Sequence, residues 1–425
     1  MTRHLTFYIM IGLVLGLVVG WGMHIAITAA GPGGAPVLHG AAQAFPIITT
    51  LFLRLVKMII APLVFSTLVV GIAHMGDTGA LGRVGVRSLA WFICASLVSL
   101  SLGLLLVTIL QPGVGVGLPL PPITADTGID KAAFNIKDFV THIVPASMIQ
   151  AMADNEIIQI VVFSVFVGVG ISAAGEKAAP LVRATDALAS VMLKITSYVM
   201  RFAPFAVFAA VANTLVERGP EVIAQLGYFM LSFYVGLAIL WCVLLGIAFA
   251  LIGPRTAQLV RHIRDPLLLA FSTASSEAAY PRTLEALERF GVPPKIAGFV
   301  LPLGYSFNLD GSMMYMTFAS LFIAQAYGIH LPLSAQITML LVLMVTSKGI
   351  AGVPRASLVV IAATLPLFKI PEAGLLLILA VDHFLDMGRS ATNVVGNAIA
   401  ASVIARWEGS LGADSGEEAE IPAAT

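Results

Sequence analysis

The sequence is poor in charged residues. Only 11% of its 425 residues are Asp, Glu, Lys or Arg, whereas a soluble domain has about 25%. The positive and negative charges cancel, so the charge balance gives no reason to expect a nucleic-acid partner. With a hydrophobic content of 58% and a mean hydropathy of +0.96, the low charge predicts an integral membrane protein.

Cysteine and the common cofactor motifs are also scarce. Cys94 and Cys242 both lie in apolar runs and are too few for a disulfide framework or a zinc site. The HExxH, GxSxG, Walker A and GxGxxG patterns are absent, so we expect no ATP, nicotinamide cofactor or catalytic metal. We therefore expect a protein that is not an enzyme.

Long apolar runs dominate the first 252 residues. Six of them can cross a bilayer: Leu5–Ala30, Phe45–Ala73, Ser88–Leu110, Phe139–Ala174, Leu188–Val216 and Val222–Ile252. The first run is longer than a signal-peptide core and is predicted to be an uncleaved span. The fourth is interrupted at Asp154–Glu156 and is predicted to be broken, and the fifth has Pro204 in its middle.

The links between these runs predict the topology. Residues 31–43 and 74–87 are expected to be connecting links, and residues 111–133 form a Pro/Gly-rich segment that is typical of an external loop. An excess of Arg and Lys falls on every second link. The positive-inside rule then predicts a cytoplasmic N-terminus.

The pattern changes after the sixth run. Three apolar segments are each interrupted by small or polar residues, at 272–276, 306–312 and 346–357. Ordinary kinks explain any one of these breaks, but three breaks in one half of the chain favour the discontinuous helices of a transporter site. The tips at 272–276 and 349–354 would then meet over a cavity, where their N–H groups attract carboxylates.

The last apolar run carries a polar stripe. It holds Asp382, Asp386, Arg389, Asn393 and Asn397 at spacings of 4, 3, 4 and 4. At about 100° per residue they fall within a sector of roughly 80° on one helix face. Each charge at a helix centre costs on the order of 2.5–3.5 kcal/mol to insert. A solvated helix at the membrane edge is the alternative, but apolar residues continue on both sides of the stripe, which favours a solute-binding site.

Two other classes of membrane protein fit less well. An intramembrane aspartyl protease needs two carboxylates that share one site and a GxGD pattern, whereas Asp310 lies in NLDG. A channel would be expected to line its pore with rings or filters. A stripe that combines an anion, a cation and amides between interrupted helices suits stoichiometric binding better.

Four segments resemble a known family. They read SSE (275–277), GYSFNLDGS (304–312), SKGIAGVP (347–354) and DMGRSATNVVGN (386–397). They are similar to the dicarboxylate/amino acid:cation symporters, the glutamate transporter family, and look closest to its bacterial proton/glutamate symporters. The resemblance covers nearly the whole chain and is strongest from Leu267 to Glu408.

The resemblance implies an all-α fold with eight transmembrane helices, two re-entrant helical hairpins at about 258–292 and 333–370, and inverted repeats. It implies a homotrimer in the lipid of the bacterial inner membrane, with both termini cytoplasmic. Residues 1–80 and 113–218 would form a scaffold with an external loop, residues 81–112 and 219–407 a moving transport domain, and residues 408–425 a tail.

The resemblance also implies substrate-binding residues: Ser275, Ser276, Gly349, Val353, Asp386, Arg389, Ser390 and Asn393. Arg389 would bind the side-chain carboxylate of the substrate, and Asp386 would bind its ammonium group. Dicarboxylate carriers of the family tend to have Ser in place of Asp386, and carriers of neutral amino acids usually lack the Arg. We therefore expect elevator-type uptake of L-glutamate or L-aspartate, with a C4-dicarboxylate such as succinate, malate or fumarate as the alternative.

The cation-coupling residues implied are Glu277, Asn308, Asp310 and Asn397. Sodium-coupled members typically have Asp at the position of Asn397, and a Tyr with Thr-Ser where this chain has Phe92, Ala95 and Ser96. Protons are therefore favoured, with Glu277 and Asp310 as candidate proton carriers. Asn308 and Asp310 would remain as metal ligands if the chain were sodium-coupled.

The second hairpin tip departs from the family at Arg355, where many members have Gly. It would either add a second cation near the substrate carboxylate or face the aqueous vestibule, and we favour the vestibule.

Overall fold

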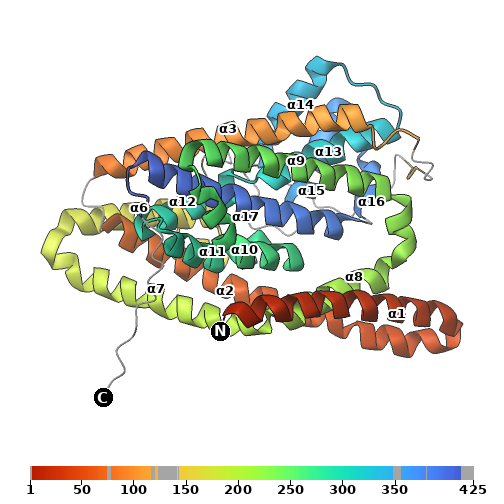
Figure 1. Cartoon of the computed structure of the whole chain (residues 1–425), viewed down its shortest axis with the longest axis horizontal. Coiled ribbons are helices and arrows are strands. Elements are labelled where there is room, and N and C mark those ends of the chain that lie inside the picture. The colour runs from red at the N-terminus through yellow and green to blue at the C-terminus, as the bar shows by residue number, and fades with distance from the viewer. Residues whose placement is uncertain are drawn as a thin grey trace.

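The computed structural model describes residues 2–73, 78–115, 120–122, 141, 143–347, 356–379 and 381–412. Every regular element in this part of the chain is a helix, and most helices are long rods (Figure 1). Five stretches of the described residues are long and apolar enough to cross a bilayer: Phe7–Ala30, Ala44–Ala73, Gly82–Leu110, Ile157–Asn213 and Gly227–Ile252. The prediction of an all-α fold is confirmed for these residues, and the five stretches are compatible with a polytopic membrane protein.

The first helix is longer than its apolar run. α1 (Thr2–Ala42) continues through the expected link at 31–43, and only a turn at Gln43 separates it from α2 (Ala44–Ala73). The prediction of a link there was wrong. Ala42 is buried among Ala209, Ala212 and Val216, so packing against a neighbouring helix outweighs local propensity.

That neighbour is α8 (Ala203–Gln225), which packs along α1. The close approach of α1 to α8 depends on glycine, because a Cβ at Gly16 would lie 2.7 Å from the carbonyl oxygen of Phe208. Small residues that let backbones approach are a common means of packing helices in membranes.

The third helix also starts earlier than expected. α3 (Thr78–Leu110) takes in most of the predicted link at 74–87. Val84 and Ser88 are buried, and Gly85 faces the ring of Phe299. The first turns of α3 therefore have a packed face even though their sequence is rich in glycine.

The fourth predicted element is broken, as expected. α5 (Met148–Ala153) and α6 (Ile157–Ala174) are separated at Asp154–Glu156, where Asn155 has a φ of +55°. Asn tolerates the left-handed region better than most residues. Most of the predicted external loop at 111–133 lies outside the described residues.

The fifth predicted span forms two helices. α7 (Ala179–Val199) packs on α2, whereas α8 packs on both α1 and α2. The 3₁₀ turn η2 (Met200–Phe202) joins them, and Pro204 lies in the first turn of α8. Proline lacks the N–H that a continuous helix needs but fits the first turn of a new one. The sixth span is α9 (Gly227–Ile252).

The C-terminal half consists of shorter helices, as its interruptions predict. α10 (Arg255–Thr273) and α11 (Ser276–Phe290) pack on each other around a tip at Ala274, which has a φ of +49°. The remaining helices are α12 (Pro294–Phe307), α13 (Asp310–Ala326), α14 (Leu333–Thr346), α15 (Ala356–Thr364), α16 (Leu375–Leu379) and α17 (Asp382–Trp407). Short 3₁₀ turns are η1 (Gly175–Ala178), η4 (Leu365–Phe368) and η5 (Glu372–Gly374).

The polar stripe lies on a central, buried helix. α17 packs against α3, α9, α10, α11, α12 and α13, and Figure 1 shows it between α3 and α9 on one side and α10 and α11 on the other. Nearly all of its residues from Leu385 to Ala405 are buried. The stripe therefore faces protein rather than lipid, and its charges need partners inside the bundle.

Candidate functional site

Two charges of the stripe pair with each other. Arg389 donates from Nε to Asp386 Oδ1 at 3.0 Å, and its Nη2 lies 2.6 Å from the same oxygen in an ion pair. The hydroxyl of Ser390 donates to the same oxygen at 3.0 Å. The side chains of Arg389 and Asp386 are 7% and 18% exposed, so this ion pair is largely removed from solvent. The i, i+3 and i+4 spacings place all three groups on one helix face.

The rest of the Arg389 guanidinium faces an aromatic ring. Its Cζ lies 4.9 Å from the ring centroid of Tyr315, a cation–π distance. Tyr315 in turn donates its phenolic proton to Asp382 Oδ1 at 2.7 Å. Arg389 Nη1 is buried and has no hydrogen-bond partner among the described residues. A buried, unused donor on a cation is unusual in native proteins and suits an incoming anion.

Asn393 is bound to the start of α13. Its Oδ1 accepts from the N–H groups of Gly311 at 2.9 Å and Ser312 at 3.3 Å, and its Nδ2 donates to Ser312 Oγ at 3.2 Å. These contacts satisfy two of the free N–H groups at a helix N-terminus. Asn393 therefore couples α13 to α17 next to the ion pair.

A second cluster lies where α12 ends and α13 begins. Asn308 and Leu309 interrupt the helix, and Asn308 Nδ2 donates to Asn397 Oδ1 at 3.2 Å. Asp310 is fully buried and accepts from the hydroxyl of Ser99 at 3.1 Å. Asn308 Oδ1 and Asn397 Nδ2 have no further hydrogen-bond partner within the described chain.

Two glycines let the helices of this cluster approach. A Cβ at Gly396 of α17 would overlap the carboxylate of Asp310, and one at Gly304 of α12 would overlap the amide of Asn397. The predicted coupling residues Asn308, Asp310 and Asn397 are thus brought together by close helix crossings.

The tip of the α10–α11 pair carries three further predicted residues. The hydroxyl of Ser275 caps α11 by accepting from Ala278 N at 3.2 Å. Glu277, in the first turn of α11, interacts electrostatically with Lys57 of α2 and with Asp386. Ser276 is the first residue of α11. Predicted residues Gly349 and Val353, with Arg355, lie outside the described residues.

Several partners of the site were missed by sequence reasoning. Ser312 lies in the segment GYSFNLDGS and Tyr315 one helical turn after it. Their hydrogen-bond partners, Asn393 and Asp382, are 81 and 67 residues away in the chain. From α9, Tyr234 donates to the carbonyl oxygen of Phe384 at 2.5 Å, and Trp241 Nε1 donates to Thr392 Oγ1 at 2.8 Å. These bonds fix the rotation of α17, and α9 gives no sequence signal for them because it is almost uniformly apolar.

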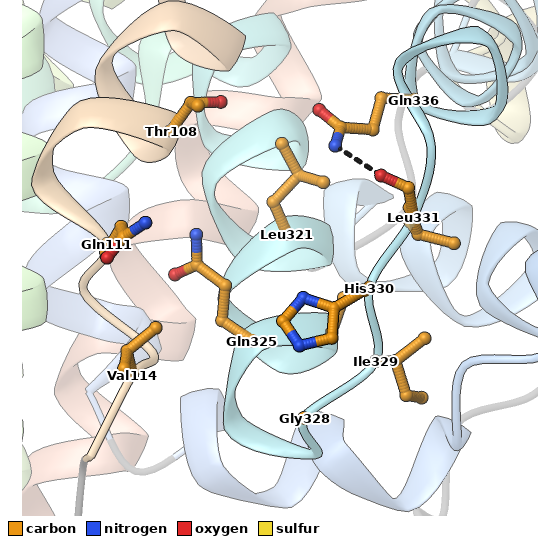
Figure 2. A pocket seen from close by; sticks show the side chains of 11 residues that line it. Thr108, Gln111, Val114, Leu321, Gln325, Gly328, Ile329, His330, Leu331 and Gln336 are labelled. Atoms are coloured by element: carbon orange, nitrogen blue, oxygen red, sulfur yellow. Dashed lines mark hydrogen bonds between the residues drawn. The ribbon is translucent and has the colours of Figure 1, made fainter.

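A separate pocket of about 180 Å³ lies at the far end of α3 and α13 (Figure 2). Its lining is Thr108, Gln111, Val114, Leu321, Ala324, Gln325, Gly328, Ile329, His330, Leu331 and Gln336. Gln325 links the end of α13 to the end of α3: it accepts a hydrogen bond from Gly113 N at 3.0 Å and donates one to Val107 O at 3.2 Å. None of the described site residues of the stripe lines this pocket.

Comparison with known proteins finds matches that cover nearly the whole chain. The model of the sodium:dicarboxylate symporter family matches residues 5–407. The chain is 40% identical over 419 residues to the proton/sodium-glutamate symport protein of Geobacillus stearothermophilus, with 97% of both chains covered. It is 39% identical over 420 residues to the proton/glutamate-aspartate symporter of Escherichia coli K12, covering 95% of this chain and 93% of the relative. It is 37% identical over 419 residues to the C4-dicarboxylate transport protein of Laribacter hongkongensis, covering 97% and 91%.

Proposed function

The chain belongs to the sodium:dicarboxylate symporter family, and on this premise we propose that it takes up L-glutamate or L-aspartate together with protons. The observation that carries the proposal is the buried ion pair of Arg389 with Asp386, in which Arg389 Nη1 remains unused. The names of the relatives favour an acidic amino acid or a C4-dicarboxylate. The ion pair favours the amino acid.

Charge balance is the reason. With no substrate bound, Asp386 neutralises Arg389. An acidic amino acid brings a side-chain carboxylate for the guanidinium and an ammonium group for the released Asp386, so both charges stay paired. A C4-dicarboxylate would pair with Arg389 but place a carboxylate beside Asp386. Uncompensated like charges in a buried site are strongly unfavourable, which is a basis for discrimination.

In this mechanism Arg389 orients the side-chain carboxylate by two parallel N–H···O bonds. Ser390 and Asn393, with Ser275, Ser276 and the tip residues Gly349 and Val353, would hold the amino and carboxylate groups of the amino acid backbone. The position of Ser275 and Ser276 at the start of α11 supports this role. N–H groups at a helix start attract anions.

The second cluster suits the coupled cation. The carboxylate of Asp310 is fully buried, and a buried carboxylate must be neutralised by a proton or a metal ion before its surroundings can move across a membrane. Asn397 offers an amide where sodium-coupled members have a carboxylate, which favours the proton. Asp310 and Glu277 are the proposed proton carriers, and the oxygens of Asp310 and Asn308 are the groups that would bind sodium in the alternative case.

We extend the proposal to the architecture of the family. The α10–α11 pair and α14 with α15 would be two re-entrant hairpins, and together with eight spans they would form a homotrimer in the bacterial inner membrane. Both termini would be cytoplasmic. The breaks at Ala274 and Asn308 support this arrangement. In this scheme α3 and the chain from α9 to α17 move past a scaffold by an elevator-type mechanism, with no enzymatic step.

Uptake into proteoliposomes tests the proposal. Labelled L-aspartate, L-glutamate and succinate are supplied under an inward proton gradient without sodium, and then under a sodium gradient alone. Proton-driven accumulation of the amino acids supports both the substrate and the coupling assignment. Accumulation of succinate instead would reject the role of Asp386, and uptake with sodium alone would reject the role given to Asn397.

A further inference from the structure

The chain folds back on the bundle directly after α17. We call Trp407–Gly412 the C-terminal strap. Gly409, at a φ of +65°, ends the helix, with Gly409 N donating to Arg406 O at 3.0 Å and Ser410 N to Ala405 O at 2.9 Å. This pattern is a Schellman motif, which reverses the chain direction at a helix end.

One side of the strap is bound to α3. Arg87 Nη1 donates to Trp407 O at 2.7 Å and to Glu408 Oε1 at 2.6 Å. Arg83 Nε lies 3.9 Å from the other oxygen of Glu408, and the rings of Trp91 and Trp407 meet edge to face at 5.8 Å. The side chain of Glu408 is 12% exposed, whereas those of Arg87 and Arg83 are 39% and 56% exposed, so the contact is half-buried and partly screened by salt.

The other side of the strap is bound to both open ends of the α10–α11 hairpin. Gly412 N donates to the carbonyl oxygen of Gly291, directly after α11, at 2.9 Å. Arg255, the first residue of α10, donates from Nη1 to Leu411 O at 3.3 Å and also to Gly412 O. Leu411 packs against the hydrophobic core. The strap therefore joins α3, α17 and the two ends of the hairpin at one end of the bundle.

We propose that the strap is a positioning element for the substrate site: it fixes the base of the α10–α11 hairpin against α3 and α17 and so holds the hairpin tip beside Asp386 and Arg389. Only the link to substrate binding rests on the proposed function. α11 has 15 residues and is therefore roughly 22 Å long. At this length a rotation of about 5° at the base moves the tip by roughly 2 Å, whereas binding groups must be held within about 0.5 Å.

The test compares two truncations of the full chain. The first ends after Trp407 and removes the rest of the strap, Glu408–Gly412, and the matched control ends after Gly412 and keeps the whole strap. Spin labels are placed at Val86 of α3 and Val260 of α10, which are 69% and 39% exposed, in a background in which both native cysteines are serine. Double electron–electron resonance then gives the distance distribution between α3 and the hairpin.

We expect a broader distribution for the chain without the strap and the same width for the control as for the full chain. Equal widths in all three chains would overturn the proposal, whatever the substrate turns out to be. If L-glutamate and L-aspartate fail to bind even to the full chain, the proposed substrate is wrong, but the distance measurement still decides the role of the strap.

Point variants keep the test informative if the shorter chain does not fold. Gly412→Pro removes the N–H that binds Gly291, whereas Gly412→Ala keeps it, with a Cβ in ordinary contact at 3.5 Å. We expect labelled L-aspartate to bind about two- to tenfold more weakly to the Pro variant, as for the loss of one hydrogen bond, and equally well to the Ala variant. The double variant Glu408→Arg with Arg87→Glu should recover affinity lost by Glu408→Arg alone. A drop in Tm without a change in affinity or in distance width would reduce the strap to a stability element and overturn the proposal.

Discussion

Replacing Asp386 with serine should exchange one substrate class for another. Asp386 Oδ1 accepts one hydrogen bond from Arg389 Nε at 3.0 Å and one from Ser390 at 3.0 Å, and Arg389 Nη2 lies 2.6 Å from it in an ion pair. In Asp386→Ser the guanidinium loses the carboxylate that it contacts directly, which is also the carboxylate proposed to bind the ammonium group. The same change removes the repulsion that a second carboxylate of the substrate would meet.

The magnitude follows from the contacts. A hydrogen bond to a charged group contributes about 1.5–3 kcal/mol, and each 1.4 kcal/mol is about tenfold in affinity. L-aspartate should therefore bind about 10- to 150-fold more weakly to Asp386→Ser. Succinate should gain affinity, because Arg389 becomes available without competition. Removing one partner of a buried ion pair costs about 3–5 kcal/mol of folding stability, but the 18% exposure of Asp386 admits water, which lowers this cost.

The assay is competition between succinate and L-aspartate for proton-driven uptake into proteoliposomes. The matched control is Asp186→Ser, which removes an exposed carboxylate of α7 and should leave the ratio unchanged. A ratio of succinate to L-aspartate that does not rise in Asp386→Ser would refute the assignment of Asp386 to the ammonium group. A loss of uptake of both substrates with a protein that still folds would show instead that Asp386 acts only through the orientation of Arg389.

Three further variants test other parts of the site. Gly396→Ala places a methyl group against the carboxylate of Asp310 and should lower the free energy of unfolding by about 1–3 kcal/mol and abolish cation-driven uptake. The control is Gly246→Ala on α9, whose added methyl group would face open space. Equal Tm values for the two variants would contradict the close crossing of α17 with Asp310. Tyr234→Phe removes one bond from α9 to α17 and should weaken substrate binding up to about tenfold, which equilibrium dialysis measures; undiminished binding would show that α17 does not need this bond. Asn397→Asp supplies the carboxylate of sodium-coupled members and should make uptake respond to a sodium gradient at constant pH, and an unaltered sodium response would contradict the role of this position.

The sequence alone determined the features that depend on local composition and helical period. Charged residues are costly to bury in lipid, so membrane-spanning helices appear in the sequence as long apolar runs. A fixed rotation of about 100° per residue places Asp386, Arg389 and Asn393 on one face whatever surrounds them. Small and polar residues at 272–276 and 306–312 predicted interruptions that the structure has at Ala274 and at Asn308–Leu309.

Only the tertiary structure decided which groups meet across helices. Ser99 reaches Asp310 over 211 residues of sequence, and Arg87 reaches Glu408 over 321. Helix lengths also followed neighbours, since α1 extends to Ala42 where α8 covers it. Packing between helices is set by the fit of side chains that are distant in the chain, and the period of a single helix carries no information about that fit.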